Sequence, residues 1–186
     1  MTKTELRKFI KNQKSLFLNN DSYRIQTSYD ICKKICNTQE FKNSSVVFAF
    51  IPMDDEVNIG GVIVESFLQN KKVAVPLITD KDGLMEFHWI TPESPMKKNP
   101  LNIFEPYASS DTLVNMKEIK SKILLITPGL AFSENGKRLG RGKGFYDRFL
   151  NQYKEKVYKL GTAFPFQILQ DVPVSENDIP VDSVIA

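Results

Sequence analysis

The sequence contains little histidine, tryptophan and cysteine, and each scarcity narrows the classes of protein to which it can belong. Its 186 residues include one His, one Trp and two Cys. Cys32 and Cys36 lie four apart in a predicted helix, a poor arrangement for a disulfide, and no second Cys pair completes a metal site. We therefore expect reduced thiols in a cytoplasmic protein. The lone His88, beside Trp89, is typical of a hydrogen-bonded structural or surface residue.

Long apolar runs are also missing. No segment approaches the roughly 18 apolar residues of a membrane-spanning helix. The basic start MTKTELRKFIKNQK is not followed by the apolar core of a secretory signal. The net charge of +3 is a small basic bias for a dedicated nucleic-acid binder. We expect a monomeric enzyme with an anionic ligand, and neither a membrane nor a nucleic acid as partner.

Length and composition fit one globular domain spanning residues 1–186. The chain is 41% hydrophobic and 25% charged, which is ordinary for a protein with a buried core. Short, continuous apolar runs predict four buried strands, at 44–52, 71–78, 121–129 and 157–164. Amphipathic spacing predicts four helices, at 2–18, at 27–41, within 54–70 and at 144–154. Residues 83–90 are expected to form a half-exposed strand, and 91–112 a long excursion. This alternation predicts an α/β fold, a single three-layer α/β/α domain with a mostly parallel sheet.

A glycine cluster follows the third buried strand. Three of the nine glycines fall in RLGRGKGFYD, residues 138–147, where they alternate with Arg141 and Lys143. Ligands of open α/β sheets bind beyond the carboxyl ends of the strands, and the start of a helix attracts phosphate. The spacing fits neither a Walker A loop nor a dinucleotide fingerprint. The cluster therefore predicts a phosphate or nucleotide site of another kind, or else a structural glycine turn with a solvated basic face.

Asp147 lies in the first turn of the helix expected after the glycines. A carboxylate is favoured there by the helix dipole, so a capping role is one reading. The other is Mg²⁺ binding, because magnesium takes one or two carboxylates together with substrate phosphates. Asp178, in SENDIP, is the candidate second carboxylate.

Two segments together carry a family resemblance. PGLAFSENGKRLGRGKGFYDR, from residue 128, and DVPVSENDIPVD, from residue 171, resemble the 5-formyltetrahydrofolate cyclo-ligase family. KTELR (3–7) and FIPMDDE (50–56) are weaker matches, and residues 79–120 show none. The resemblance implies conversion of 5-formyltetrahydrofolate to 5,10-methenyltetrahydrofolate with ATP and Mg²⁺. It also implies a fold similar to sugar-phosphate isomerases and coenzyme A transferases.

The resemblance also implies roles for individual residues. Lys143 and Arg141 would be catalytic, Asp147 and Asp178 would hold Mg²⁺, and Ile51 and Glu56 would contact the folate. ATP would be bound by Lys3, Arg7, Arg138, Leu139, Gly140, Arg141, Gly142, Lys143, Gly144, Phe145 and Tyr146. From their aromatic rings, Tyr146 and Trp89 are further folate candidates, although core packing is an equal reading for Trp89. Asn177 departs from the family, in which histidine is frequent at that position.

The expected chemistry is phosphoryl transfer from ATP to the formyl oxygen, followed by ring closure through N10. Such transfer depends on positioning and charge neutralisation, which Arg138, Arg141, Lys143 and Mg²⁺ would supply. The surface lysines would help to attract a polyglutamylated folate. Lys8, Lys11 and Lys14 are interpreted as a solvated helix face. Two alternatives stay open: an enzyme of similar fold that acts on a sugar phosphate without ATP, and a nucleotide-sensing or RNA-binding module.

Overall fold

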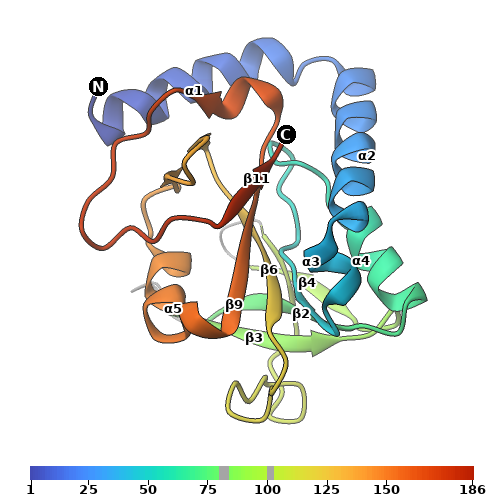
Figure 1. The fold of residues 1–186 in the computed structure, drawn as a ribbon. Helices are drawn as coiled ribbons and strands as arrows, with labels where there is room; N and C mark the ends of the chain where they lie inside the picture. The colour runs from blue at the N-terminus through green and yellow to red at the C-terminus, as the bar shows by residue number, and fades with distance from the viewer. Residues whose placement is uncertain (80–83, 100–102) are drawn as a thin grey trace.

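A computed structural model describes residues 1–79, 84–99 and 103–186. Its centre is a six-stranded sheet in the order β11-β9-β6-β1-β2-β3 (Figure 1). All neighbouring strands pair in parallel except β3, which is antiparallel to β2. The strands are β1 (Val46–Phe48), β2 (Lys72–Ile78), β3 (Met85–Ile90), β6 (Ile123–Pro128), β9 (Val157–Thr162) and β11 (Ser183–Ile185). The predicted mostly parallel sheet is confirmed.

Side chains alternate along the strands between two hydrophobic clusters, because successive residues point to opposite faces. In β6, Leu124 and Ile126 join the cluster that includes side chains of α2 (Asp21–Asn37), α3 (Gln39–Asn43) and α4 (Gly60–Leu68). Ile123 and Leu125 join the other cluster, which is covered by α5 (Phe145–Tyr153). Helices therefore cover both faces of the sheet (Figure 1), and the predicted three-layer α/β/α arrangement is confirmed.

Helix α1 (Lys3–Phe17) lies across the end of the sheet at which the parallel strands finish (Figure 1). Its Leu6 and Ile10 pack against Ala131 and Leu139 of a second, three-stranded sheet. That sheet is made of β7 (Ala131–Ser133), β8 (Arg138–Leu139) and β10 (Ile168–Leu169). A β-hairpin thus stands between the third buried strand and the glycines, where the sequence predicts only a loop.

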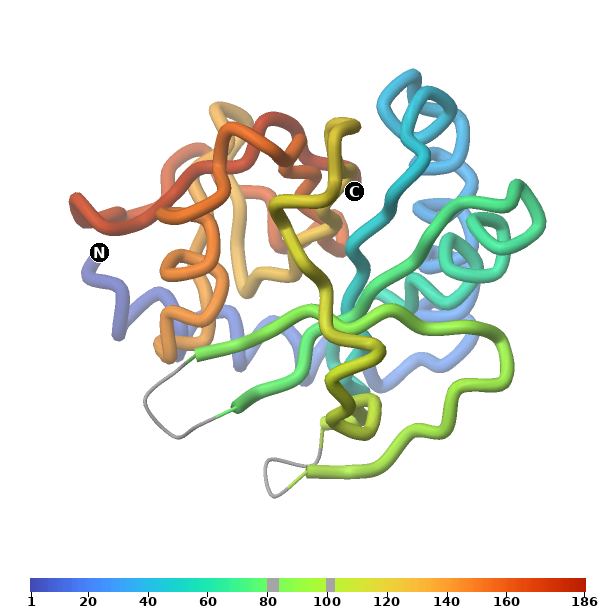
Figure 2. Tube along the Cα trace, turned by 90° about the horizontal axis from the view of Figure 1, so that it is seen from below, coloured from blue at the N-terminus to red at the C-terminus, as the bar shows by residue number. Residues whose placement is uncertain are grey.

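Other predicted boundaries need correction. The helix expected at 27–41 begins earlier and is split at Thr38, whose side chain caps α3. Only residues 46–48 of the expected strand 44–52 are strand. The excursion 91–112 contains the antiparallel pair β4 (Met96–Lys98) and β5 (Phe104–Pro106), while its residues 100–102 lie outside the described part. Residues 112–114 then hydrogen-bond along β3, and Figure 2 shows this part of the chain crossing that strand. Two 3₁₀ turns, η1 (Lys154–Lys156) and η2 (Pro165–Gln167), complete the described elements.

In the described part of the chain, no helix is both long enough and apolar enough to cross a membrane. Cys32 and Cys36 are free thiols, as the sequence predicts. Burial disfavours the thiolate and raises the pKa of Cys36 to about 11. These cysteines therefore behave as small apolar side chains of the α2 layer.

Candidate active site

A cavity of about 490 Å³ opens at the carboxyl ends of β1, β2 and β6. This is the edge at which ligands of parallel sheets bind. Four segments far apart in the sequence meet there: the start of α1, residues 50–56, the glycine cluster and the tail. The predicted site residues that line the cavity are Lys3, Arg7, Ile51, Glu56, Arg138, Leu139, Gly140, Arg141, Gly142, Lys143, Gly144, Phe145, Tyr146, Asp147 and Asp178.

The glycine loop, residues 140–144, leads from β8 into α5. Gly142 and Gly144 adopt φ values of +103° and +69°, which side-chain-bearing residues rarely take. The carbonyl of Gly140 accepts a hydrogen bond of 3.1 Å from Nε of Arg7, so α1 fixes the start of the loop. Lys143 is exposed at the cavity and stands just before α5, where first-turn N–H groups lack helical partners. Bare backbone and cationic side chains are therefore presented together.

Arg138 and Asp147, predicted to serve ATP and Mg²⁺ separately, are bonded to each other. Nη2 of Arg138 lies 2.7 Å from Oδ1 of Asp147, and only 4% of the arginine side chain is exposed. The same carboxylate oxygen accepts a 3.2 Å bond from the N–H of Ile179. The guanidinium also lies 5.6 Å from the ring centre of Tyr146. Burial, with the negative charge of Glu56, raises the pKa of Tyr146, so its hydroxyl stays protonated.

Lys3 and Asp178 form a second pair across the cavity mouth. The ammonium of Lys3 contacts Oδ2 of Asp178, and that oxygen also accepts a 2.6 Å bond from the N–H of Ser175. Burial opposes ionisation of Asp178, but the bonds from Lys3 and Ser175 outweigh it and lower its pKa. Each predicted metal ligand is thus already bonded to a predicted ATP-binding cation.

The donor set suits magnesium rather than a metal that needs a full protein cage. No group of three or more His, Cys, Asp or Glu side chains suited to a metal exists among the described residues. Asp147 and Asp178 line the same cavity as the cationic loop. Because Mg²⁺ takes one or two carboxylates and completes its shell with water and phosphate oxygens, two carboxylates fit an ion that arrives with a nucleotide.

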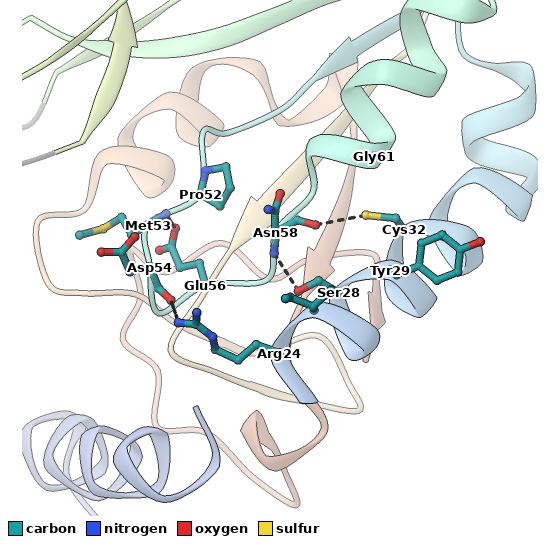
Figure 3. Close-up of a pocket in the computed structure, with 11 residues that line it drawn as sticks. Arg24, Ser28, Tyr29, Cys32, Pro52, Met53, Asp54, Glu56, Asn58 and Gly61 are labelled. Atoms are coloured by element: carbon teal, nitrogen blue, oxygen red, sulfur yellow. Dashed lines mark hydrogen bonds between the residues drawn. The ribbon is translucent and has the colours of Figure 1, made fainter. Parts of the chain in front are cut away.

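Residues 53–56 form a tight turn that presents Glu56. Oε2 of Glu56 accepts a 3.0 Å bond from the N–H of Met53, and Oε1 accepts bonds of 3.2 and 3.3 Å from Arg141. On the other side of this segment is a second cavity of about 610 Å³, shown in Figure 3. Met53 and Glu56 line both cavities, so the turn forms the wall between them.

The structure separates Trp89 from the other folate candidates and contradicts the solvated interpretation of Lys14. The described lining of the first cavity does not include Trp89, which packs edge-on against Phe48 at 6.1 Å and lies 5.6 Å below the ammonium of Lys72. The alternation of β3 packs the partly buried Trp89 against the core cluster beneath α5, which agrees with the core-packing interpretation of this residue. Lys14 is not solvated. It is 7% exposed and bonds to Asp55, because it continues the buried stripe of Leu6 and Ile10 at four-residue spacing.

The sequence also leaves part of the cavity wall unassigned. The additional lining residues are Phe50, Met53, Pro76, Ile78, Met85, Ile103, Phe104, Glu105, Pro128 and Gly129. Most are apolar and could cover a flat ring. Glu105 is a buried carboxylate that accepts a 2.9 Å bond from Nδ2 of Asn99. Its position in the Pro- and Asn-rich excursion gives no periodicity that marks it as buried.

Comparison with known proteins agrees with this geometry. A sequence model of the 5-formyltetrahydrofolate cyclo-ligase family matches residues 1–186. The 5-formyltetrahydrofolate cyclo-ligase of Mus musculus is 31% identical over 169 residues, covering 87% of this chain and 83% of the mouse protein. That of Escherichia coli K12 is 33% identical over 141 residues, covering 75% of this chain and 76% of its own length. The solved 5,10-methenyltetrahydrofolate synthetase of Aquifex aeolicus has a TM-score of 0.79 and 28% identity, covering 100% of this chain and 89% of that one.

Proposed function

The chain belongs to the 5-formyltetrahydrofolate cyclo-ligase family, and we propose that residues 1–186 act as one cyclo-ligase domain. The proposed reaction converts 5-formyltetrahydrofolate to 5,10-methenyltetrahydrofolate with Mg²⁺ and ATP, releasing ADP and phosphate. The observation that carries the proposal is one cavity lined by both the cationic glycine loop and the segment that presents Glu56. A phosphate donor and a polar, flat-ringed acceptor would therefore meet in one place.

The chemistry requires activation of the formyl oxygen, which is a poor leaving group. That oxygen attacks the γ-phosphorus of ATP, and the bond to the ADP oxygen breaks. N10 then attacks the formyl carbon and loses its proton, and the C–O bond breaks to release phosphate. Lys143 and Arg141 would neutralise charge on the transferring group, while Lys3, Arg7, Arg138 and the loop 139–146 would hold the nucleotide.

Asp147 and Asp178 are the residues that would hold Mg²⁺, which would offset the charge of the ATP phosphates. The proposal is supported by the cavity that they share and by their ion pairs with Arg138 and Lys3. On the folate side, Glu56 would accept hydrogen bonds from pterin amino groups. Ile51 and Tyr146 would line the ring pocket. We further propose a cytoplasmic monomer whose exposed lysines favour polyglutamylated folate.

The test is formation of 5,10-methenyltetrahydrofolate, followed by its near-ultraviolet absorbance. We expect product only when ATP, Mg²⁺ and 5-formyltetrahydrofolate are all present. EDTA should stop the increase in absorbance, and excess Mg²⁺ should restart it. Asp147→Asn should require more Mg²⁺ to reach half-maximal rate. Product formed without ATP, or turnover of a sugar phosphate instead, would overturn the proposal.

A further inference from the structure

A chain of four charged side chains links α1 to the cavity; we call Lys14, Asp55, Arg141 and Glu56 the charge chain. Nζ of Lys14 donates to the backbone oxygen of Asp55 at 2.7 Å and to its Oδ2 at 2.9 Å. The other oxygen, Oδ1, accepts from Nη2 of Arg141. Arg141 also donates to Oε1 of Glu56. The glycine loop and the turn that presents Glu56 are therefore joined through Arg141.

The charge chain carries two cations and two anions; its two ends are buried, while Arg141 and Asp55 in the middle are 40% and 38% exposed. Only 8% of the Lys14 side chain and 11% of the Glu56 side chain are exposed. Burial lowers the pKa of Lys14, while its bonds to Asp55 oppose the change. Burial also disfavours the carboxylate of Asp55, but Lys14 and Arg141 outweigh it and lower the pKa of that group. Asp55 therefore stays ionised near neutral pH, with a cation on each side.

The turn at 53–56 does not depend on Lys14 alone for its shape. Arg24 donates a 3.1 Å bond to the carbonyl of Asp54, and the N–H of Asn58 donates a 3.1 Å bond to Ser28, as Figure 3 shows. These contacts anchor the segment to α2. A buried ammonium is costly to desolvate, and an apolar side chain could fill its place. The particular contribution of Lys14 is its positive charge. It binds one carboxylate oxygen of Asp55, while Arg141 binds the other.

We propose that Lys14 and Asp55 are positioning residues that allow Arg141 to serve both substrates, so that ATP and folate promote each other's binding. The inference rests on the proposed function. Without substrates, Arg141 pairs with Glu56. When the triphosphate binds, Arg141 shifts toward its oxygens, and Oε1 of Glu56 becomes free to accept from the pterin. Because Lys14 still neutralises Asp55, only Glu56 is left unpaired, and the folate satisfies it.

Removal of the Lys14 charge should disturb this exchange. Release of Arg141 would then leave both Asp55 and Glu56 without a cation, so Arg141 would remain on the carboxylates. The reciprocal effect of each substrate on the affinity of the other should disappear, since such coupling is symmetrical between two ligands. Neutralising Asp55 in the same protein would restore the charge balance and, with it, the exchange.

The experiment measures the Kd of 5-formyltetrahydrofolate by calorimetry on the full chain, with and without a non-hydrolysable Mg-ATP analogue. The ratio of the Kd without the analogue to the Kd with it reports the coupling. We expect this ratio to be about five or more in the unmodified protein. In Lys14→Gln, which keeps a hydrogen-bond donor, and in Lys14→Met the ratio should fall close to one. Lys14→Arg should keep it. The matched control is Lys11→Met, on an exposed position of the same helix, where the ratio should not change.

The compensating variant separates a charge effect from simple damage to the fold. Lys14→Gln combined with Asp55→Asn should regain most of the ratio, which a merely structural role of Lys14 would not produce. If the unmodified protein binds both ligands with a ratio of one, or if Lys14→Gln keeps the full ratio, the inference is overturned. If it binds neither ligand, the proposed function itself fails. If the Lys14 single variants do not fold, the double variant is compared with Lys11→Met instead. A double variant whose Kd ratio falls to one would then count against the inference.

Discussion

Arg138 and Asp147 show how single residues prepare this cavity for highly charged ligands. A buried guanidinium would be costly alone, but it is bonded to a carboxylate at 2.7 Å. Lys3 with Asp178 and Arg141 with Glu56 repeat the arrangement nearer the surface. The cations that would meet phosphate are therefore held in place beforehand by the acids that would meet metal or folate. On ligand binding, each of these cations and acids would exchange one charged partner for another, so no unpaired charge would be buried.

Lys143 gives the sharpest test at this scale, because it is exposed at the cavity immediately before α5. Lys143→Ala should lower kcat/KM for ATP by about 100-fold, the usual effect of losing one group that stabilises transition-state charge. Lys154→Ala is the matched control, since Lys154 is exposed at the opposite end of the same helix. Steady-state kinetics of methenyl formation measure both. Equal rates for the two variants would show that the loop is misassigned.

Lys14 marks how far sequence reasoning reaches at single residues. The glycine loop is predictable because an ordinary turn does not need three glycines that alternate with cations. Its residues do line one cavity. Lys14 is missed because charge is taken as a sign of exposure. The signal exists in its four-residue spacing from Leu6 and Ile10. Phe9 and Leu16, two apolar residues of the same helix, are 40% and 72% exposed, so an apolar side chain is no surer sign of burial here than a charge is of exposure.

Among the elements, the β7–β8 hairpin determines where the glycine loop lies relative to the central sheet, because the loop follows β8 directly. Phe132 of β7 is fully buried, and its ring lies where Gly129 and Gly161 lack side chains. A Cβ added at Gly161 would be 2.5 Å from that ring. The hairpin can thus approach the ends of β6 and β9 only because these two positions are glycine. Strand patterns do not reveal this contact, which depends on a long-range pairing.

Gly161→Ala should therefore lower the free energy of unfolding by about 1–3 kcal/mol, as overpacking a tight core does. Urea denaturation measures the change. The control is Gly61→Ala in α4, where the added Cβ would lie 3.4 Å from Cys32 and alanine favours the helix by up to about 1 kcal/mol. A destabilisation no larger at Gly161 than at Gly61 would contradict the packing described here.

Across the whole molecule, the buried His88 should make stability depend on pH. Its Nδ1 lies 2.9 Å from the hydroxyl of Thr112, and burial lowers its pKa despite the opposing charge of Glu86. The folded protein therefore resists a proton that the unfolded chain accepts below about pH 6.5. The contribution of His88 to the free energy of unfolding should be complete above that pH. As the pH decreases below it, the free energy of unfolding should fall by at most about 1.4 kcal/mol per pH unit.

His88→Asn, which can keep the bond to Thr112 without titrating, should flatten this slope between pH 5 and 6.5. Thermal or urea unfolding across that range provides the measurement. The carboxylates with lowered pKa values, such as Asp55 and Asp178, lose their contribution at more acidic pH, so the two effects occupy different windows. An identical pH profile for His88→Asn and the unmodified protein would assign the acid sensitivity elsewhere.

The fold as a whole is predictable in its class but not in its strand order. Continuous apolar runs identify β2, β6 and β9 because strands buried on both faces carry no alternation. Nothing in those runs tells that β6 lies between β1 and β9, or that β11 completes the sheet beside β9. The cavity wall at 103–105 is equally hidden, because it comes from a segment in which the sequence shows neither periodicity nor a recognisable motif. Pairing partners are set by tertiary contacts that a one-dimensional pattern does not contain.

The contact between Lys3 and Asp178 has a consequence for biosynthesis. Residues 175 positions apart close the same cavity mouth, so a growing polypeptide cannot assemble it while the tail is still inside the ribosome. Lys3 therefore stays without this partner until Asp178 has been translated and has left the ribosome. Nascent fragments truncated before Asp178 would lack both this contact and β11, so they should bind nucleotide more weakly than the full chain.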